Sequence, residues 1–167
     1  MALCGMFSAL LCICAWLSVP FGDGAITLQT FGVFLCLGVL GGKWGTIAIA
    51  VYLCLGVTGV PVFSGFRGGL GALLGTTGGY LTGFLLCGLT YWLLTFLFPK
   101  KQLLAMIAGL LVCYCFGSLW YYFLYTSNTA TLSIIFIKCV LPYLLPDALK
   151  LILARFLSKR ISQKISP

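Results

Sequence analysis

Long apolar runs dominate the chain, and short polar or glycine-rich stretches separate them. Because a transmembrane helix needs about 20 predominantly apolar residues, this pattern predicts an all-α integral membrane protein. The second and third runs are short, so their helices should tilt little or be covered by neighbouring helices. No linker or internal repeat is visible, and we expect residues 1–167 to form one six-helix domain. The predicted spans are residues 2–19, 27–40, 44–60, 77–98, 103–125 and 130–157.

The last apolar run is too long and too interrupted for one straight helix. Residues 130–157 would extend over about 42 Å as a continuous helix. The run contains Pro142 and Pro146, and proline is favoured at the start of a helix but disfavoured in its interior. We therefore predict a break near residues 142–146, with a separate helical piece before it and the final span beginning at Pro146.

Charged residues are few, and they lie between or beyond the apolar runs. The chain has ten Lys and Arg, only Asp23 and Asp147 as acids, and no His. With a cytoplasmic N-terminus, the outer loops hold Arg67, Asp23 and Lys138, whereas most basic residues fall inside. The positive-inside rule therefore predicts that both termini are cytoplasmic. The inner basic residues are Lys43, Lys100, Lys101, Lys159, Arg160 and Lys164.

The composition excludes most catalytic and metal chemistry. Without His, and with two acids, catalytic triads and usual metal sites cannot be assembled. The nine cysteines fall almost entirely inside apolar runs and form no C-x-x-C pair, so we interpret them as buried free thiols and expect no metal. The ATP-binding pattern G-x-x-x-x-G-K-[ST] is also absent. The N-terminal run lacks the basic region and cleavage site of a signal peptide, and we expect a retained span.

An irregular, glycine-rich segment is predicted between the third and fourth spans. The stretch GVPVFSGFRGGLGALLGTTGGYLTGF, residues 59–84, holds nine glycines and one arginine. Each interior glycine costs a helix about 1 kcal/mol relative to alanine. At membrane depth, irregular backbone is tolerated only where it is buried in protein or lines a cavity. The segment is therefore predicted to line a site.

The residues of this segment have two possible roles. Near Arg67, we favour a site in which Gly68 and Gly69 present backbone N–H groups and in which Phe66 and Tyr80 form apolar walls. The alternative is that the glycines only permit close contact between helices. We favour that packing role for three glycines at four-residue spacing, Gly75, Gly79 and Gly83.

A second polar constellation lies in LPYLLPDALKLILA, residues 141–154. Asp147 and Lys150 are three residues apart, which places them on one face of a helix. An ionisable residue in a membrane segment is by default a candidate for function. The alternative is an internal ion pair that only neutralises itself near the membrane interface. We favour a functional use, because Asp147 is one of only two acids.

Three stretches together resemble the BioY family of biotin transporters. The glycine-rich run quoted above resembles the central signature of that family. SVPFGDGAITLQTFGVFLCLGVLGGKWG is similar to its first loop and second span, and LPYLLPDALK is similar to its C-terminal Pro-Asp-x-x-Lys element. The three stretches occur in the family's order and span most of residues 18–155. Two positions differ: Thr76 replaces a common proline, and Arg67 stands where small or polar residues are usual.

The resemblance implies the substrate-binding S component of an energy-coupling-factor (ECF) transporter. Such a protein binds biotin and mediates its uptake across the bacterial cytoplasmic membrane. Its implied partners are a transmembrane coupling protein and two ATPase subunits, and it needs no cofactor of its own. The family docks through small residues of the first helix, a role that Gly5 and Ala9 could fill. Packing within the first span is the alternative for these two residues.

The resemblance also suggests how the ligand would be held. Asp147 would accept a hydrogen bond from a ureido N–H of biotin, and Lys150 would donate to a ligand oxygen or hold Asp147 ionised. The other assignments come from the chemistry of biotin and not from the family motif: Arg67, or the N–H groups of Gly68 and Gly69, would receive the carboxylate. The remaining expected residues are Phe66, Tyr80 and Trp16 around the rings, and Thr27 and Gln29 as a lid or as a helix cap.

Two other functions stay open at this point. One is a solitary permease that carries biotin or another small vitamin without an ATPase module. The other is an intramembrane enzyme that uses Asp147 and Lys150 as acid and base. We disfavour the enzyme, because only Arg67 is available as a further catalytic group.

Overall fold

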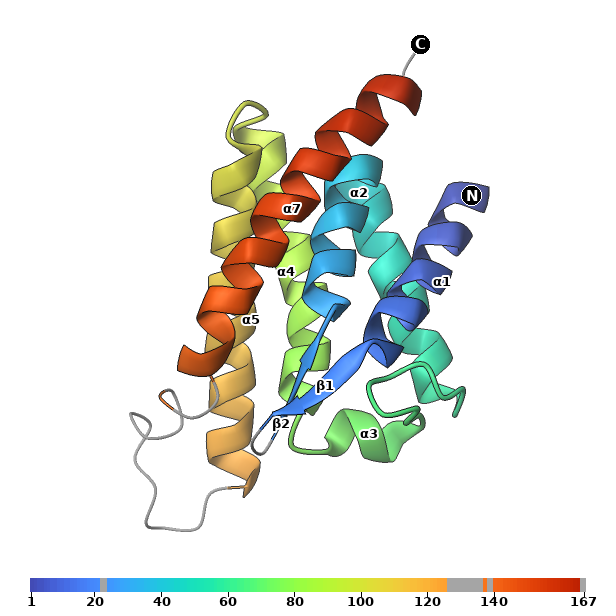
Figure 1. Cartoon of the computed structure of the whole chain (residues 1–167), viewed down its shortest axis with the longest axis vertical. Helices are drawn as coiled ribbons and strands as arrows, with labels where there is room; N and C mark the ends of the chain where they lie inside the picture. Colours follow the sequence, from blue (N-terminus) through green and yellow to red (C-terminus); the bar gives the residue numbers. More distant parts are fainter. Residues whose placement is uncertain (22–23, 126–136, 138–139, 166–167) are drawn as a thin grey trace.

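The structure of the chain, a computed structural model, describes residues 1–21, 24–125, 137 and 140–165. Its helices form a bundle along the long axis of the molecule (Figure 1). Asp23 and most of the first part of the predicted last span lie outside the described residues. The helices are α1 (Ala2–Trp16), α2 (Gln29–Val57), α3 (Leu70–Leu74), α4 (Gly78–Leu97), α5 (Gln102–Tyr125) and α7 (Leu141–Ile165), and the strands are β1 (Ser18–Phe21) and β2 (Gly24–Thr27).

Helix α2 consists of two arms that fold back on each other. At Gly41 the backbone leaves the helical conformation, with φ 77° and ψ 175°. This positive φ favours glycine, because a side chain would strain the backbone there. A Cβ built on Gly45 would lie 2.9 Å from Leu37 Cα, so the two arms are in direct contact. The bend therefore separates the second and third helical segments of the bundle.

The apolar helices identify an integral membrane protein. Within the described part of the chain, α2, α4 and residues 102–124 of α5 are apolar and long enough to cross a membrane, and α1 is a shorter apolar helix. With the two arms of α2 counted separately, this part contains six helices of more than ten residues. The protein is therefore an all-α membrane protein apart from one small hairpin.

The hairpin of β1 and β2 was not predicted. We expected the first span to reach residue 19, but α1 ends at Trp16 and Ser18 pairs with Thr27 in an antiparallel ladder. Pro20 cannot continue a helix, and the residue before a proline prefers extended backbone. Ile26 and Thr27 are β-branched and favour a strand. The described residues on either side of positions 22–23 are thus paired strands.

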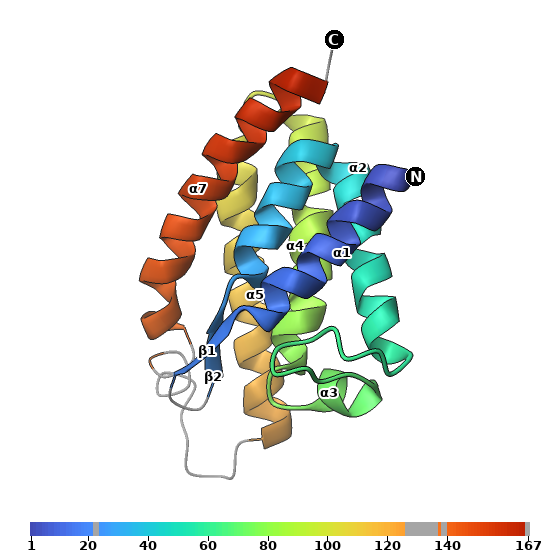
Figure 2. The same ribbon diagram turned by 45° about the vertical axis from the view of Figure 1, so that its right-hand side comes forward.

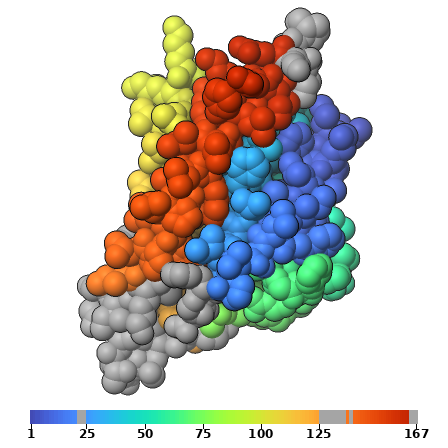
Figure 3. All heavy atoms as spheres, viewed as in Figure 1, coloured from blue at the N-terminus to red at the C-terminus, as the bar shows by residue number. Residues whose placement is uncertain are grey.

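The start of the last helix also differs from the prediction. We expected it to begin at Pro146, but α7 begins at Leu141 and contains Pro146 in its interior. Pro142 lies in the first turn, where the missing N–H has no helical partner in any case. Helix α7 packs along α2 and crosses the face of the molecule seen in Figure 3. This tertiary contact offsets the backbone hydrogen bond that Pro146 removes.

Glycines allow α4 and α5 to approach closely. A Cβ on Gly83 would lie 2.9 Å from Cys113 Sγ, and one on Gly109 would lie 2.7 Å from Cys87 Sγ. A Cβ on Gly79 would collide with Trp120 Cβ, which moves only with the α5 backbone. The packing role predicted for Gly79 and Gly83 therefore agrees with these contacts.

The two ends of the bundle differ in character. The start of α1, the C-terminal end of α7, the bend of α2 and the α4–α5 connection lie at one end, and the hairpin and α3 lie at the other (Figures 1 and 2). The first end carries Lys43, Lys100 and Lys101 in its connections, and Lys159 and Arg160 near the end of α7. The glycine-rich segment, in contrast, belongs to the hairpin end.

The close contact between α4 and α5 predicts that one glycine-to-alanine change destabilises the protein and that another does not. Gly79→Ala should lower the free energy of unfolding by about 1–3 kcal/mol, because the added methyl group forces the helices apart. Gly5→Ala is the matched control: among the described residues, no atom lies within 4 Å of its Cβ position. Thermal unfolding in detergent measures both. Equal midpoints for the two variants would contradict the close approach.

Candidate functional site

A cavity of about 530 Å³ opens at the hairpin end of the bundle. Pockets of roughly 300–1,000 Å³ are typical of small-molecule sites. Its walls come from β2, α2, the segment between α2 and α4, and helices α4, α5 and α7. The described lining residues are Ala25, Thr27, Gln29, Thr30, Phe63, Ser64, Arg67, Ala72, Thr76, Thr77, Tyr80, Leu81, Phe84, Leu110, Cys113, Tyr114, Tyr121, Ile137, Pro142, Tyr143 and Asp147.

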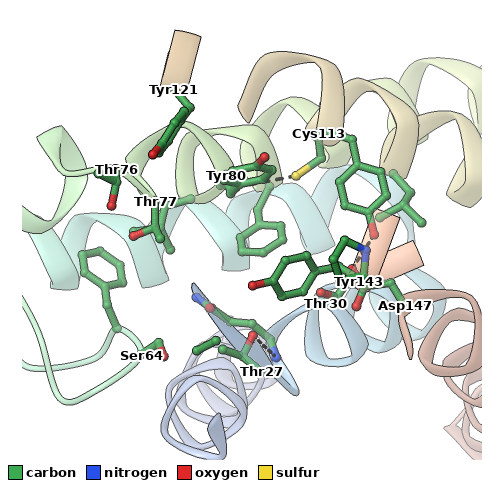
Figure 4. Close-up of a pocket in the computed structure, with 18 of the residues that line it drawn as sticks. Thr27, Thr30, Ser64, Thr76, Thr77, Tyr80, Cys113, Tyr121, Tyr143 and Asp147 are labelled. Atoms are coloured by element: carbon green, nitrogen blue, oxygen red, sulfur yellow. Dashed lines mark hydrogen bonds between the residues drawn. The ribbon is translucent and has the colours of Figure 1, made fainter. Parts of the chain in front are cut away.

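Helical spacing explains which side chains of α4, α5 and α7 reach the cavity. Residues three, four and seven positions apart lie on one face of a helix. The lining residues follow this spacing, for example Tyr114 and Tyr121 on α5 and Tyr143 and Asp147 on α7. Figure 4 shows Tyr121, Tyr143 and Asp147, with Tyr80 of α4, around the cavity. The walls are largely apolar and aromatic, and they also carry nine hydroxyl-bearing residues, the Gln29 amide, the Arg67 guanidinium and the Asp147 carboxylate. This composition is typical of small-ligand sites.

Asp147 is the acid of the site, and two side chains hold it in place. Lys150 Nζ donates to Asp147 Oδ1 at 2.7 Å, and Tyr114 Oη donates to Asp147 Oδ2 at 2.6 Å. All three residues are buried. A carboxylate has about four lone-pair positions. After accepting these two bonds, Asp147 can still accept hydrogen bonds from a ligand in the cavity.

Lys150 has a different place from the one expected for a ligand contact. It is nine-tenths buried, binds Asp147, and is not among the residues that line the cavity. Removing one partner of a buried ion pair leaves an uncompensated charge, so the pair is maintained as a unit. The structure therefore supports an ion pair in which Lys150 holds Asp147 in place. It does not support a direct hydrogen bond from Lys150 to a ligand in the cavity.

Arg67 lines the cavity from a tight turn in the glycine-rich segment. Phe63 N donates to Arg67 O at 2.9 Å, and Arg67 Nε donates to Ser64 O at 3.1 Å. Gly65 and Phe66, in the middle of the turn, have φ angles of 71° and 55°, as in a type I′ turn. Ser64 lies across the cavity from Asp147 in Figure 4. The cavity thus has a cationic wall and an anionic wall on different sides.

Phe66, Gly68 and Gly69 do not line the cavity, although we expected them in the site. The Phe66 ring is exposed and stacks on Trp16 with centroids 5.3 Å apart, and Trp16 is likewise outside the lining. Gly69 N already donates to Gly56 O at 2.7 Å. A Cβ on Gly68 would collide with Val60 O. These glycines fold the segment back onto the end of α2.

Thr27, Gln29 and Tyr80, which we predicted from the sequence, line the cavity. Thr27 Oγ1 accepts a hydrogen bond from Gln29 N at 3.3 Å, so Thr27 also stabilises the start of α2. The Gln29 side chain donates to Tyr52 Oη, which in turn donates to Val62 O at 3.2 Å. The hairpin end of α2 is thereby joined to the glycine-rich segment.

Comparison with known proteins identifies the family. The BioY family model matches residues 1–167. The chain belongs to the BioY family. A biotin transporter BioY from Thermotoga maritima is 38% identical over 164 residues, which cover 95% of this chain and 93% of that protein. A probable biotin transporter BioY from Pyrococcus horikoshii is 37% identical over 164 residues, which cover 96% of this chain and 94% of that protein.

The fold of this BioY protein matches a solved structure as well. A crystal structure of the S-component for biotin from an ECF-type ABC transporter aligns with a TM-score of 0.86 at 26% identity. The alignment covers 97% of this chain and 89% of the other. The chain therefore has the S-component fold.

Sequence reasoning missed Tyr114, the partner of Asp147 in this BioY protein. A signal was present: Tyr114, Ser118 and Tyr121 form a stripe of hydroxyl groups at helical spacing in an apolar span. Ser118 is buried and lies 3.5 Å from the Tyr80 hydroxyl. Such a stripe indicates a helix face that meets polar groups. Within the described chain, no three His, Cys, Asp or Glu residues group as metal ligands.

Gly5 and Ala9 lie on the outside of α1 in this BioY protein. Both residues are exposed, and a Cβ on Gly5 would have no described atom within 4 Å. Packing of Gly5 within the bundle is therefore not observed. A small-residue face of α1 is open instead.

The Asp147–Lys150 pair predicts a compensating double substitution. Lys150→Met should lower the free energy of unfolding by about 3–5 kcal/mol, because it leaves a buried carboxylate without its counter-charge. Asp147→Leu combined with Lys150→Met should recover most of this loss. Thermal unfolding of both purified variants measures the difference. A double variant as unstable as Lys150→Met alone would show that the ion pair does not govern the stability of this wall.

Proposed function

We propose that this BioY protein captures biotin from outside the cell and mediates its uptake as the S component of an ECF transporter. The observation that carries the proposal is a cavity of suitable size with Asp147 on one wall and Arg67 on another. The names of the relatives and of the matching crystal structure point to the same ligand.

Biotin carries the groups that this cavity complements. Its ureido ring has two N–H donors, and its tail ends in a carboxylate. Asp147, held by Tyr114 and Lys150, accepts from the ureido N–H groups, and such a charge-assisted bond is about twice as strong as a neutral one. Arg67 receives the carboxylate through its planar guanidinium group. Phe63, Tyr80 and the other aromatic walls enclose the apolar thioether ring.

The proposed topology places the cavity toward the outside. Six spans cross the bacterial cytoplasmic membrane, with the glycine-rich segment between the third and fourth. The start of α1, the end of α7, the bend of α2 and the α4–α5 connection lie at one end of the bundle. Lys43 adjoins that bend and Lys100–Lys101 belong to that connection, and the positive-inside rule assigns this end to the cytoplasm. Biotin then enters from the opposite, hairpin end.

Transport energy would come from partner subunits. The proposed partners are a transmembrane coupling protein, which docks on the Gly5 and Ala9 face of α1, and two ATPase subunits. The chain needs no cofactor of its own, and biotin is its cargo. An enzymatic role is set aside, because the family is a transporter family. The remaining alternative is a solitary permease, and co-purification of ATPase subunits from the source organism would argue against it.

Equilibrium binding of labelled biotin to the detergent-purified chain tests the proposal. Desthiobiotin should displace the label, because it retains the ureido ring and the carboxylate, whereas riboflavin should not. A folded sample that binds no biotin would refute the proposed ligand.

Asp147→Asn should weaken biotin binding about tenfold or more, because the amide replaces one charge-assisted acceptor with a weaker one. Cys87→Ser is the control, since Cys87 is buried on α4 outside the cavity lining. Dissociation constants from the binding assay compare the two. An unchanged affinity in Asp147→Asn would show that the carboxylate of Asp147 does not contribute to biotin binding.

Arg67→Gln should abolish discrimination between biotin and biotinamide. The wild-type chain should bind biotin about tenfold more tightly than the amide, because only the carboxylate forms an ionic bond with Arg67. In the variant the two ligands should bind equally. Arg160→Gln, at the other end of the molecule, is the matched control and should keep the preference. A preference retained in Arg67→Gln would assign the carboxylate to another group.

A further inference from the structure

Trp16, the last residue of α1, contacts the glycine-rich segment at two points. Its Nε1 donates to Pro61 O at 2.8 Å. Its ring stacks on Phe66 with an interplanar angle of 25°. Pro61 lies two residues before the Phe63–Arg67 turn, and Phe66 lies in the middle of the turn. One side chain of α1 therefore contacts both the approach to this turn and its centre.

The other side of the same turn rests on α2. The Tyr52 ring meets the Phe63 ring edge to face, with centroids 5.6 Å apart, and Tyr52 Oη donates to Val62 O. Tyr52 and Phe63 are fully or almost fully buried. The turn is thus held between Tyr52 of α2 on the inside and Trp16 of α1 on the outside. Its residues Phe63, Ser64 and Arg67 form part of the cavity wall.

The backbone of the turn needs support of this kind. Phe66 has a φ of 55°, and in the described chain it is the only residue other than glycine with a positive φ. Such a conformation is costly for a residue with a side chain and persists where surrounding contacts stabilise it. The Phe66 ring does not line the cavity, and its stacking on Trp16 supplies such a contact. Trp16 therefore contacts the segment that forms this wall through Phe66 and Pro61.

We propose that Trp16 is a positioning residue that holds the Phe63–Arg67 turn against the cavity and ties this wall to the end of α1. The proposal deepens the proposed function, since the turn carries Arg67, and it rests on biotin as the ligand. The chain passes directly from Trp16 into the hairpin, and Leu28 N donates to Leu17 O at 3.1 Å to close the hairpin's base. The hairpin and the Phe63–Arg67 turn, which form two walls of the cavity, are thus both attached to the same end of α1.

The first test is the rate at which biotin dissociates from the purified chain. Trp16→Leu should raise this rate about tenfold, because it removes one stacked ring pair and one hydrogen bond. Trp16→Phe keeps a ring for Phe66 but loses the hydrogen bond, and should give an intermediate rate. Trp44→Leu is the matched control, because Trp44 is exposed to a similar degree, 41% against 39%, but lies at the bend of α2. A wild-type rate in Trp16→Leu would overturn the proposal.

A double-substitution cycle separates positioning from a general loss of stability. If Trp16 acts through Phe66, the effects of Trp16→Leu and Phe66→Ala on the dissociation rate should not be additive. The double variant should then release biotin about as fast as Trp16→Leu alone. Independent, multiplicative effects would show that Trp16 acts by another route and would contradict the proposal.

Hydrogen exchange in the ligand-free chain distinguishes failure of this inference from failure of the proposed function. The amides of Phe63 and Gly69 are bonded to Arg67 O and Gly56 O, so they report on the turn and its base. Trp16→Leu should make the Phe63 amide exchange faster, while Trp44→Leu should not. Unchanged exchange would overturn the inference even if biotin binds. Faster exchange would support it even if the ligand proved to be another molecule.

Discussion

The buried contact of Asp147 with Lys150 and Tyr114 is the interaction on which the site depends. A carboxylate inside an apolar bundle is tolerated only when it is paired and hydrogen-bonded. Lys150, one turn along α7, supplies the counter-charge, and Tyr114 joins α7 to α5. The same two bonds fix both carboxylate oxygens of a residue that lines the cavity, and lone-pair positions remain for a ligand. The contact that makes the acid tolerable therefore also orients it.

The rest of the structure gives this acid a cavity of the right shape. Close approach at Gly79, Gly83 and Gly109 joins α4 and α5 into one wall. The glycine-rich segment folds back on α2 and presents Arg67 to the same space. Its backbone is irregular, yet the N–H groups of Val62, Phe63 and Gly69 donate to carbonyls of the protein. The cavity thus lies between a closely packed helical wall and a short turn that Trp16 and Tyr52 contact from both sides.

The sequence predicted the class of the protein and singled out Asp147, which lines the cavity, because hydropathy and rare charges are strong signals in a membrane chain. It did not predict the hairpin, since β1 and β2 are only four residues each and β1 follows an apolar helix directly. Phe66, Gly68 and Gly69 were expected at the ligand because they adjoin Arg67. Which of these neighbours faces the cavity depends on the Phe63–Arg67 turn, in which Gly65 and Phe66 have positive φ angles. Sequence spacing does not reveal this turn. Tyr114 was missed because its partner lies 33 residues away.

An experimental structure of the chain with biotin bound would test the central claim most directly. The account predicts that the ureido ring lies within hydrogen-bond distance of Asp147 and that the carboxylate reaches Arg67. Asp147 should keep its bonds to Tyr114 and Lys150 in that complex. Biotin in the reverse orientation, or bound outside the cavity, would contradict the account.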